Sequence, residues 1–451
     1  MGEAPPGMAC TEKAAMNERR ARLRRALGWL GPIALLLLLF LPGTFGGSGM
    51  APASAPLPSP PAAPSGAAPT TRPSSAPTGA PDLAAMVSAV EAQVSALREL
   101  APLRDVPTEI VEPAAFRTWA EGEVARNQNA ELTRCRTRVL VRLGLAEPTL
   151  DLRQLSLDLL SSQVVGRYDP TTRSLTVVNR GAGFLVPLRI TVAHEYTHAL
   201  QDQHFGFATL RSGTGVALPV DRELALQALA DGDASLLVAT WMRDHVTTEE
   251  RGELERLVAA APAPAMPPVL ARQITFPYVE GGAFAQALYD SGGWAAVDAA
   301  YARAPASTAE ILHPERYLAG WRPITVEPLR LAAPAVDDGW HETCRETLGE
   351  LGLQAWLESQ PAGPGQTLRP ADEARALAEH WTGDEVTMWE HGSSWVLGWT
   401  TAWDSDAAGA SFAGAAAASP AELRRLDRDG VRVTLRLAAD AAALELPTAA
   451  H

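Results

Sequence analysis

The chain has 451 residues, of which 47% are hydrophobic, and this length predicts two or three domains with sizeable cores. A formal net charge of −14 argues against a nucleic-acid partner, because no excess of basic side chains is available to meet phosphates. Three cysteines are too few for a disulfide scaffold, and none lies near another as in a zinc knuckle.

Residues 1–25 form a basic segment that ends in a cluster of arginines, Arg19, Arg20, Arg22, Arg24 and Arg25. The apolar run 26–46 follows, and about 20 residues suffice to cross a bilayer about 30 Å thick. Since arginines favour the cytoplasmic side, the pattern predicts a transmembrane signal-anchor with everything after residue 50 outside. A cleaved signal peptide is the alternative, because "APASA" nearby resembles a cleavage site.

Residues 47–81 form a Pro/Ala/Ser-rich segment that lacks the large apolar side chains needed to offset the entropy of ordering. We expect a disordered, extended linker between the membrane segment and the folded body. Either interpretation of the N-terminus places that body outside the cytoplasm, held at the cell membrane or secreted. In such an oxidising compartment one bridge, Cys135–Cys344, can form, and two buried unpaired thiols are an equally supported alternative.

Residues 82–334 are predicted to form the first globular domain, which is mostly helical. Apolar residues recur at helical spacing over 82–100 and over 113–143. The segment 161–180 has apolar residues on both sides of "YDPTTR" and predicts an antiparallel hairpin with an Asp-Pro turn. Helical spacing resumes over 187–203, so the hairpin leads directly into a buried helix.

The buried helix contains the string "HEYTH", in which His194 and His198 are four residues apart. On a helix this spacing places both imidazoles on one face, where both can bind one metal ion. Zinc binds such nitrogens at about 2.0–2.1 Å in tetrahedral geometry. Glu195 points to the side of the metal, where it can accept a proton from a water that zinc makes acidic. An incidental HExxH string with two ordinary histidines is the alternative.

A catalytic zinc site usually has a third protein ligand, which must come from elsewhere in the chain. His204 follows the second histidine by six residues and points away from the metal, so we do not expect it to bind. The helical segment 221–242 carries Asp231 and Asp233 where its burial is heaviest, and a buried carboxylate needs a cationic partner. On this reasoning either aspartate can be the third ligand, and Glu280 is a further candidate.

An HExxH helix followed by a second helix with an acidic "EGDA"-like motif resembles the gluzincin-type zinc metallopeptidases. In that group a glutamate on the later helix is the third ligand. The resemblance therefore implies that Asp231 of "ADGDA" takes this place, with Asp233 as the runner-up or as a partner that orients a histidine N–H. Aspartate is one methylene shorter, so the helices must sit closer together. The segments 276–301, 304–318 and 380–405 are also similar to uncharacterised extracytoplasmic HExxH proteins of bacteria and archaea.

Two further side chains are candidates for stabilising the oxyanion of a tetrahedral intermediate. Tyr278 lies in "PYVEGG" and His313 precedes Pro314, and both residue types can donate a hydrogen bond to such an oxygen. A structural role is the alternative for each, namely packing for Tyr278 and capping of a turn for His313.

Residues 335–451 differ in composition from the preceding part and predict a small α+β domain. We expect, in order, a helix, a second helix, a two-stranded hairpin across Gly392, a third helix and a last strand, over 339–359, 370–381, 384–403, 406–418 and 430–439. The tryptophans of the hairpin are expected in the core rather than on a binding face. No catalytic set is apparent in this part of the sequence.

The sequence therefore predicts an α+β protein. A zincin-like metallopeptidase domain, with a hairpin beside the metal helix, precedes a small C-terminal α+β unit. The expected function is hydrolysis of a peptide or protein substrate, with Zn²⁺ bound by His194, His198 and Asp231 and with Glu195 as general base. A catalytically silent zincin used for binding or envelope assembly is the first alternative, because Asp231 departs from the family glutamate. A metal-free surface protein is the second.

Overall fold

The computed structural model describes residues 83–449, with gaps at 128–129, 164, 182–183, 208–217, 261–264, 364 and 421–422. The predicted basic N-terminus, membrane segment and linker, residues 1–25, 26–46 and 47–81, lie outside the described residues. Within the described part, none of the helices combines the length and the apolar character that a membrane span requires.

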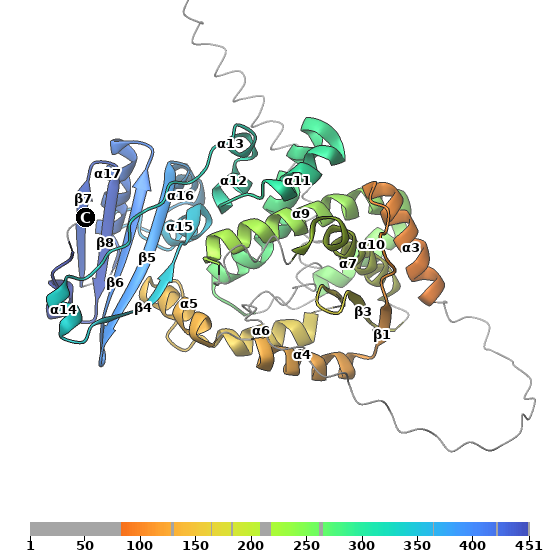
Figure 1. Ribbon diagram of the computed structural model, residues 1–451, viewed down its shortest axis with the longest axis horizontal. Coiled ribbons are helices and arrows are strands. Elements are labelled where there is room, and N and C mark those ends of the chain that lie inside the picture. The colour runs from red at the N-terminus through yellow and green to blue at the C-terminus, as the bar shows by residue number, and fades with distance from the viewer. Residues whose placement is uncertain are drawn as a thin grey trace, which may run out of the picture.

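Two groups of elements lie side by side along the long axis of the molecule (Figure 1). The first is a helical body whose helices are α3 (Leu83–Arg98), α4 (Pro113–Asn127), α6 (Leu152–Gln163), α7 (Leu185–Phe205), α9 (Val220–His245), α10 (Thr248–Ala260), α11 (Pro268–Ala302), α12 (Thr308–Leu312) and α13 (Pro314–Leu318). It also contains a small sheet of β1 (Thr108–Val111), β2 (Gly166–Asp169) and β3 (Ser174–Val178). The order is β1-β3-β2, with β2 antiparallel and β1 parallel to β3. The predicted hairpin is confirmed as β2–β3, whereas β1 was not expected.

The second group is the C-terminal unit, built on a five-stranded antiparallel sheet with the order β4-β5-β6-β8-β7. Its strands are β4 (His341–Glu346), β5 (Trp381–His391), β6 (Ser394–Trp403), β7 (Arg424–Asp429) and β8 (Arg432–Ala438). Its helices are α14 (Ala333–Asp337), α15 (Gly349–Glu358), α16 (Ala371–Ala378), α17 (Asp406–Ala417) and α18 (Ala441–Leu444). The predicted α+β class is therefore confirmed. Of the hairpin tryptophans, Trp389, Trp399 and Trp403 are buried as expected, whereas Trp395 is half-buried.

The predicted helix over 339–359 is wrong in its first half. Residues His341–Glu346 form β4, which pairs antiparallel with β5, and α15 begins only at Gly349. The neighbouring strand offers main-chain partners that local helical spacing does not reveal, so tertiary context overrides the local preference. Gly349, the first residue of α15, has a φ of +70°, a left-handed conformation that favours glycine.

Helix α5 (Ala130–Arg142) packs with the C-terminal sheet, although the predicted domain limits place it with the helical body. Its residues Cys135, Val139 and Leu140 belong to the same apolar core as the sheet tryptophans. A disulfide between Cys135 and Cys344 joins α5 to β4. Of the two alternatives for these cysteines, the structure has the bridge, which connects an early helix to the C-terminal unit.

Replacing both Cys135 and Cys344 with serine should lower the free energy of unfolding by about 2–4 kcal/mol. The bridge closes a loop across a sequence separation of 209, so its loss enlarges the unfolded ensemble. Urea denaturation of wild type, of wild type in reductant and of the double variant measures the effect. Two free thiols at these positions in the unreduced, folded wild type would contradict the assignment.

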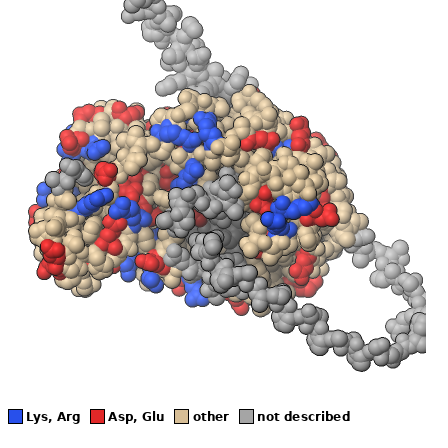
Figure 2. Space-filling view, viewed as in Figure 1, with Lys and Arg blue, Asp and Glu red and all other residues tan. Residues whose placement is uncertain are grey.

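Charged side chains of both signs are interspersed on the face of the molecule shown in Figure 2. Several oppositely charged side chains lie 2.7–2.8 Å apart in the pairs Arg138–Glu390, Arg189–Glu250 and Arg345–Glu342. Among the described residues on this face, no broad basic surface forms. Pairs of this kind at or near the surface contribute little to stability.

Candidate metal centre

Helix α7 carries the HExxH string through the centre of the helical body. From Val186 to Gln201 every residue except Arg189 is buried, because α3, α9 and the small sheet pack around the helix. The helix ends at Phe205, and the next residue, Gly206, has a φ of 70° and an N–H bond to the Asp202 carbonyl that closes the last turn. Polar side chains on such a helix lose their water, so each needs a partner inside the protein.

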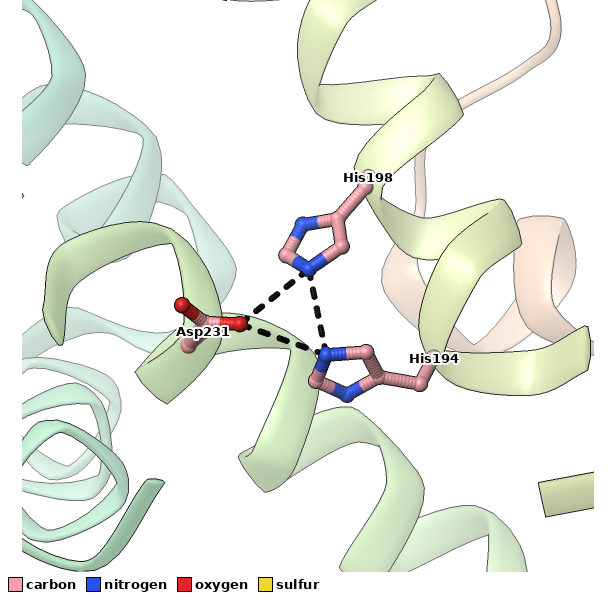
Figure 3. A group of neighbouring side chains, drawn as sticks. All are labelled: His194, His198 and Asp231. Carbon is pink, nitrogen blue, oxygen red and sulfur yellow. Dashed lines mark hydrogen bonds and ion pairs between the residues drawn. The ribbon is translucent and has the colours of Figure 1, made fainter. Parts of the chain in front are cut away.

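Three side chains converge at one point between α7 and α9 (Figure 3). The Nε2 atoms of His194 and His198 lie 3.1 Å apart, and each lies 3.3 Å from Oδ1 of Asp231. The exposed fractions of the three residues are 0%, 6% and 3%, so the group is enclosed by protein. Within the part of the chain that the structure describes, this is the one cluster of His, Cys, Asp or Glu that can hold a metal ion.

The dimensions of this triangle fit zinc. Atoms bonded to zinc at 2.0–2.1 Å in tetrahedral geometry lie about 3.3–3.4 Å from one another. The three ligand atoms here are separated by 3.1 to 3.3 Å. Two imidazole nitrogens and one carboxylate oxygen are also a donor set that zinc prefers, and three protein ligands leave one position for water or substrate.

Burial and mutual charge shift the pKa values of these groups in different directions. Burial, helped by the neighbouring His198, lowers the pKa of His194 to about 4 in spite of Asp231. Burial acts in the same direction on His198, but Asp231 and Glu195 outweigh it and raise its pKa to about 9. Burial opposes ionisation of Asp231, yet the two imidazoles lower its pKa to about 2. Asp231 is therefore an anion, and its charge favours a bound cation.

Glu195 lies beside the cluster of His194, His198 and Asp231, which is called the metal group below. Its own hydrogen-bond partner lies outside that cluster. It is 3% exposed, and its Oε2 accepts a hydrogen bond of 2.7 Å from the backbone N–H of Tyr168. Burial raises the pKa of Glu195 to about 7, although His198 opposes this shift. A carboxyl group with a pKa near neutrality can accept a proton and return it, which is what a general base requires.

Strand β2 forms an edge of the small sheet and lies against α7. Tyr168 attaches this strand to the helix twice, because its N–H binds Glu195 and its O–H donates to Oδ2 of Asp202 at 2.9 Å. Arg104 also binds Asp202, at 3.0 Å. The hairpin therefore lies beside the helix of the HExxH string as predicted, and the contact to Glu195 was not part of the prediction.

Tyr278 on α11 lies next to the metal group. Its ring centroid is 5.9 Å from that of His194, and the residue is 2% exposed. Burial, together with the charges of Asp231 and Glu195, raises the pKa of Tyr278 well above its ordinary value. The phenol stays protonated and is a hydrogen-bond donor. Of the two predicted donors, Tyr278 is the one that the structure brings to the site.

His313 has partners elsewhere. Its Nε2 lies 2.9 Å from the Glu350 carboxylate, and its Nδ1 lies 3.7 Å from Glu315. These partners belong to α15 and α13, so the ring lies where the helical body meets the C-terminal unit. A structural role for His313 fits these contacts, and the structure does not bring it into the metal group.

The other candidate ligands also have different partners. Asp233 forms a buried ion pair with Arg98 at 2.8 Å. His204 hydrogen-bonds the backbone carbonyl of Ala101 at 2.8 Å. Glu280 is half-buried on α11 and is not part of the cluster. The geometry therefore favours Asp231 as the third ligand.

A close crossing of α9 and α11 sets the position of Asp231. A Cβ added at Gly232 would lie 2.2 Å from the carbonyl oxygen of Gly281, and one added at Gly281 would lie 2.4 Å from that of Ala228. The two backbones are therefore in contact, which only glycine permits at these positions. Since Gly232 follows Asp231 directly, this contact between the two backbones fixes the position of Asp231 along α9, and therefore its position opposite α7.

Gln201 belongs to the site, and the sequence reasoning missed it. Its Oε1 lies 2.8 Å from Nδ1 of His198. A signal was available, because a buried amide one turn after His198 on an apolar helix needs hydrogen-bond partners. Tyr168 contacts Glu195 through its backbone N–H. Every residue except proline has such a group, so the residue type could not have predicted this contact.

By fold and site, the chain is an α+β protein with a buried cluster of two histidines and one aspartate. Residues 339–446 match a family described as a domain of unknown function (DUF8575). This span covers the C-terminal sheet and the helices α15 to α18, and it contains none of His194, His198 and Asp231. No curated protein and no solved structure matches the chain. The function must therefore be inferred from the site itself.

Proposed function

We propose that the chain is a membrane-anchored, extracytoplasmic zinc peptidase with a zincin-like helical body. The observation that carries the proposal is the convergence of His194, His198 and Asp231, with ligand atoms 3.1 to 3.3 Å apart, beside Glu195. Three protein ligands with an adjacent carboxyl group are typical of a catalytic zinc site, whereas structural sites have four protein ligands. Membrane attachment is proposed from residues 26–46 and the arginines before them.

In this proposal zinc, when bound, supplies a Lewis acid that polarises the scissile carbonyl and makes water acidic near neutral pH. Glu195 accepts a proton from the attacking water and later returns it to the nitrogen of the leaving amine. The N–H of Tyr168 holds one carboxylate oxygen of Glu195, so the second oxygen handles the proton. The pKa of Glu195, about 7, suits both the proton transfer from water and the proton transfer to the amine.

Two features favour a peptide as the substrate. Tyr278 presents a protonated phenol beside His194, which suits the oxyanion that develops on an attacked carbonyl. Strand β2 is an edge strand next to Glu195, and an extended peptide can add to such an edge by main-chain hydrogen bonds. Strand β2 packs against α7, and Tyr278 of α11 lies beside His194 of that helix.

Replacing Glu195 with glutamine should leave zinc binding intact and lower peptide hydrolysis by about 10²–10⁴-fold, the usual contribution of a general base. Glutamine keeps the shape of the side chain but cannot accept the proton from water. Zinc content is measured by elemental analysis, and turnover is measured with casein and a peptide library. Glu255→Gln, an exposed change of the same type on α10, is the control for both measurements.

The same experiment tests the alternative of a silent zincin used for binding or assembly. The enclosure of all four site residues, none more than 6% exposed, is the observation that favours it. Zinc bound without any Glu195-dependent turnover would support this alternative. A metal-free wild type whose Tm does not change on addition of zinc would refute both functions.

A further inference from the structure

We propose that Gln201 is a positioning residue that fixes the imidazole of His198 for metal binding. The inference rests on the proposed zinc site and concerns how the chain prepares one ligand. An imidazole can bind a metal through either nitrogen, and the hydrogen bond made by the other nitrogen decides which one. Here Nδ1 of His198 faces Oε1 of Gln201 at 2.8 Å, while Nε2 faces Asp231.

Two acceptors determine the orientation of the Gln201 amide. Its Nε2 lies 3.0 Å from the carbonyl oxygen of Ala230 and 2.9 Å from Oδ2 of Asp233. A carbonyl and an ion-paired carboxylate only accept hydrogen bonds, so the NH₂ group must face them and the amide oxygen must face His198. His198 must then donate from Nδ1–H, which leaves the lone pair of Nε2 for the metal.

A buried ion pair holds Asp233 in place. Arg98 donates from Nε and Nη2 to the two carboxylate oxygens, at 2.8 and 3.1 Å, and the Tyr301 hydroxyl donates to Oδ2 at 2.8 Å. Both Arg98 and Asp233 are 0% exposed. Arg98 also pairs with Asp298 at 2.6 Å and lies 4.4 Å from the ring centroid of Trp294. Asp233 is thus a fixed acceptor for Gln201, and its charge is already compensated.

Gln201 also links the two helices that carry the ligands. It lies on α7, and its partner Ala230 lies on α9 immediately before Asp231. One amide therefore holds the ring of His198 and ties it to the backbone beside the third ligand. Removal of such an outer partner typically weakens metal affinity by about 10–100-fold.

The test measures Zn²⁺ affinity of the full chain by competition with a chelator, together with the visible absorption of the Co²⁺-substituted protein. Gln201→Leu should bind zinc about 10–100-fold more weakly and alter the cobalt spectrum. Gln201→Glu keeps an oxygen against Nδ1 of His198, so its affinity should stay within about tenfold of wild type. Gln203→Leu is the matched control, because it loses similar bonds to the backbone of Leu103 and Arg104 and should not change either readout.

Gln201→Leu with wild-type affinity and an unchanged cobalt spectrum would overturn the inference. A purely structural role predicts that affinity follows stability, so that Gln201→Glu, which sets a carboxyl group against Asp233, would bind at least as weakly as Gln201→Leu. Nitrogen NMR of the zinc-loaded wild type needs no variant: Nδ1 of His198 should carry the proton, and a protonated Nε2 would contradict the inference. A wild type that binds no zinc overturns both proposals. The expected order of affinities without peptide cleavage supports this inference and refutes only the peptidase.

Discussion

Asparagine in place of Asp231 is expected to abolish tight zinc binding and, with it, peptide hydrolysis. The substitution keeps the volume of the side chain but removes the negative charge that faces two imidazoles at 3.3 Å. Loss of a direct ligand should cost more than the roughly 10–100-fold that loss of an outer partner costs. Zinc affinity by chelator competition and cleavage of a peptide library measure the two effects. Asp244→Asn, at the exposed end of the same helix, is the matched control.

Glutamate at position 231 tests the length of the ligand separately from its charge. The resemblance to gluzincins implies that glutamate can serve as third ligand, but here the shorter side chain already places Oδ1 3.3 Å from both Nε2 atoms. An added methylene inside a close-packed site forces the carboxylate or its helix to move. We therefore expect Asp231→Glu to bind zinc more weakly than wild type and more tightly than Asp231→Asn. Wild-type zinc affinity in Asp231→Asn would refute the assignment of Asp231 as third ligand. Tighter zinc binding in Asp231→Glu than in wild type would favour the alternative of a catalytically silent zincin.

Features that depend on a single helix were predictable from the sequence. The spacing of His194 and His198 places both rings on one face of any helix, and the structure has both Nε2 atoms 3.1 Å apart. Asp231 was predictable because a carboxylate in a buried helix needs a cationic partner, with the family resemblance choosing between it and Asp233. Helix geometry and the cost of burying charge therefore identify the two histidines and a pair of aspartates, and the resemblance is needed to select Asp231 from that pair.

Contacts between distant segments were beyond the same reasoning. Asp233 could be proposed as a ligand because its partner Arg98, 135 residues away, has no local signature. The bond from the Tyr168 backbone to Glu195 depends on how β2 packs against α7. The segment His341–Glu346 was read as helix for a related reason, since its strand pairing with β5 is supplied by residues far along the chain. The sequence therefore leaves tertiary partners open, and at His341–Glu346 the unrecognised partner strand also changes the local conformation.

Alanine in place of Gly232 should destabilise the fold by roughly 3 kcal/mol and weaken zinc binding at the same time. The new Cβ would lie 2.2 Å from the carbonyl oxygen and 2.3 Å from the carbonyl carbon of Gly281. These are backbone atoms, so no side-chain rotation relieves the overlap and α9 must move away from α11. Because Asp231 precedes Gly232 directly, this movement also displaces the ligand from its position opposite His194 and His198.

Urea denaturation of the metal-free protein and zinc titration separate the two consequences of this change. Gly252→Ala on α10 is the matched control, because its Cβ would find only Arg256 Nη1 at 3.6 Å, an ordinary contact. Alanine there should stabilise the helix by about 0.5–1 kcal/mol and leave zinc affinity unchanged. Gly281→Ala disturbs the same contact between α9 and α11 from the side of α11. The losses in free energy of unfolding caused by Gly281→Ala and Gly232→Ala should therefore not be additive. If Gly232→Ala keeps both wild-type stability and wild-type zinc affinity, contact between these backbones does not position Asp231.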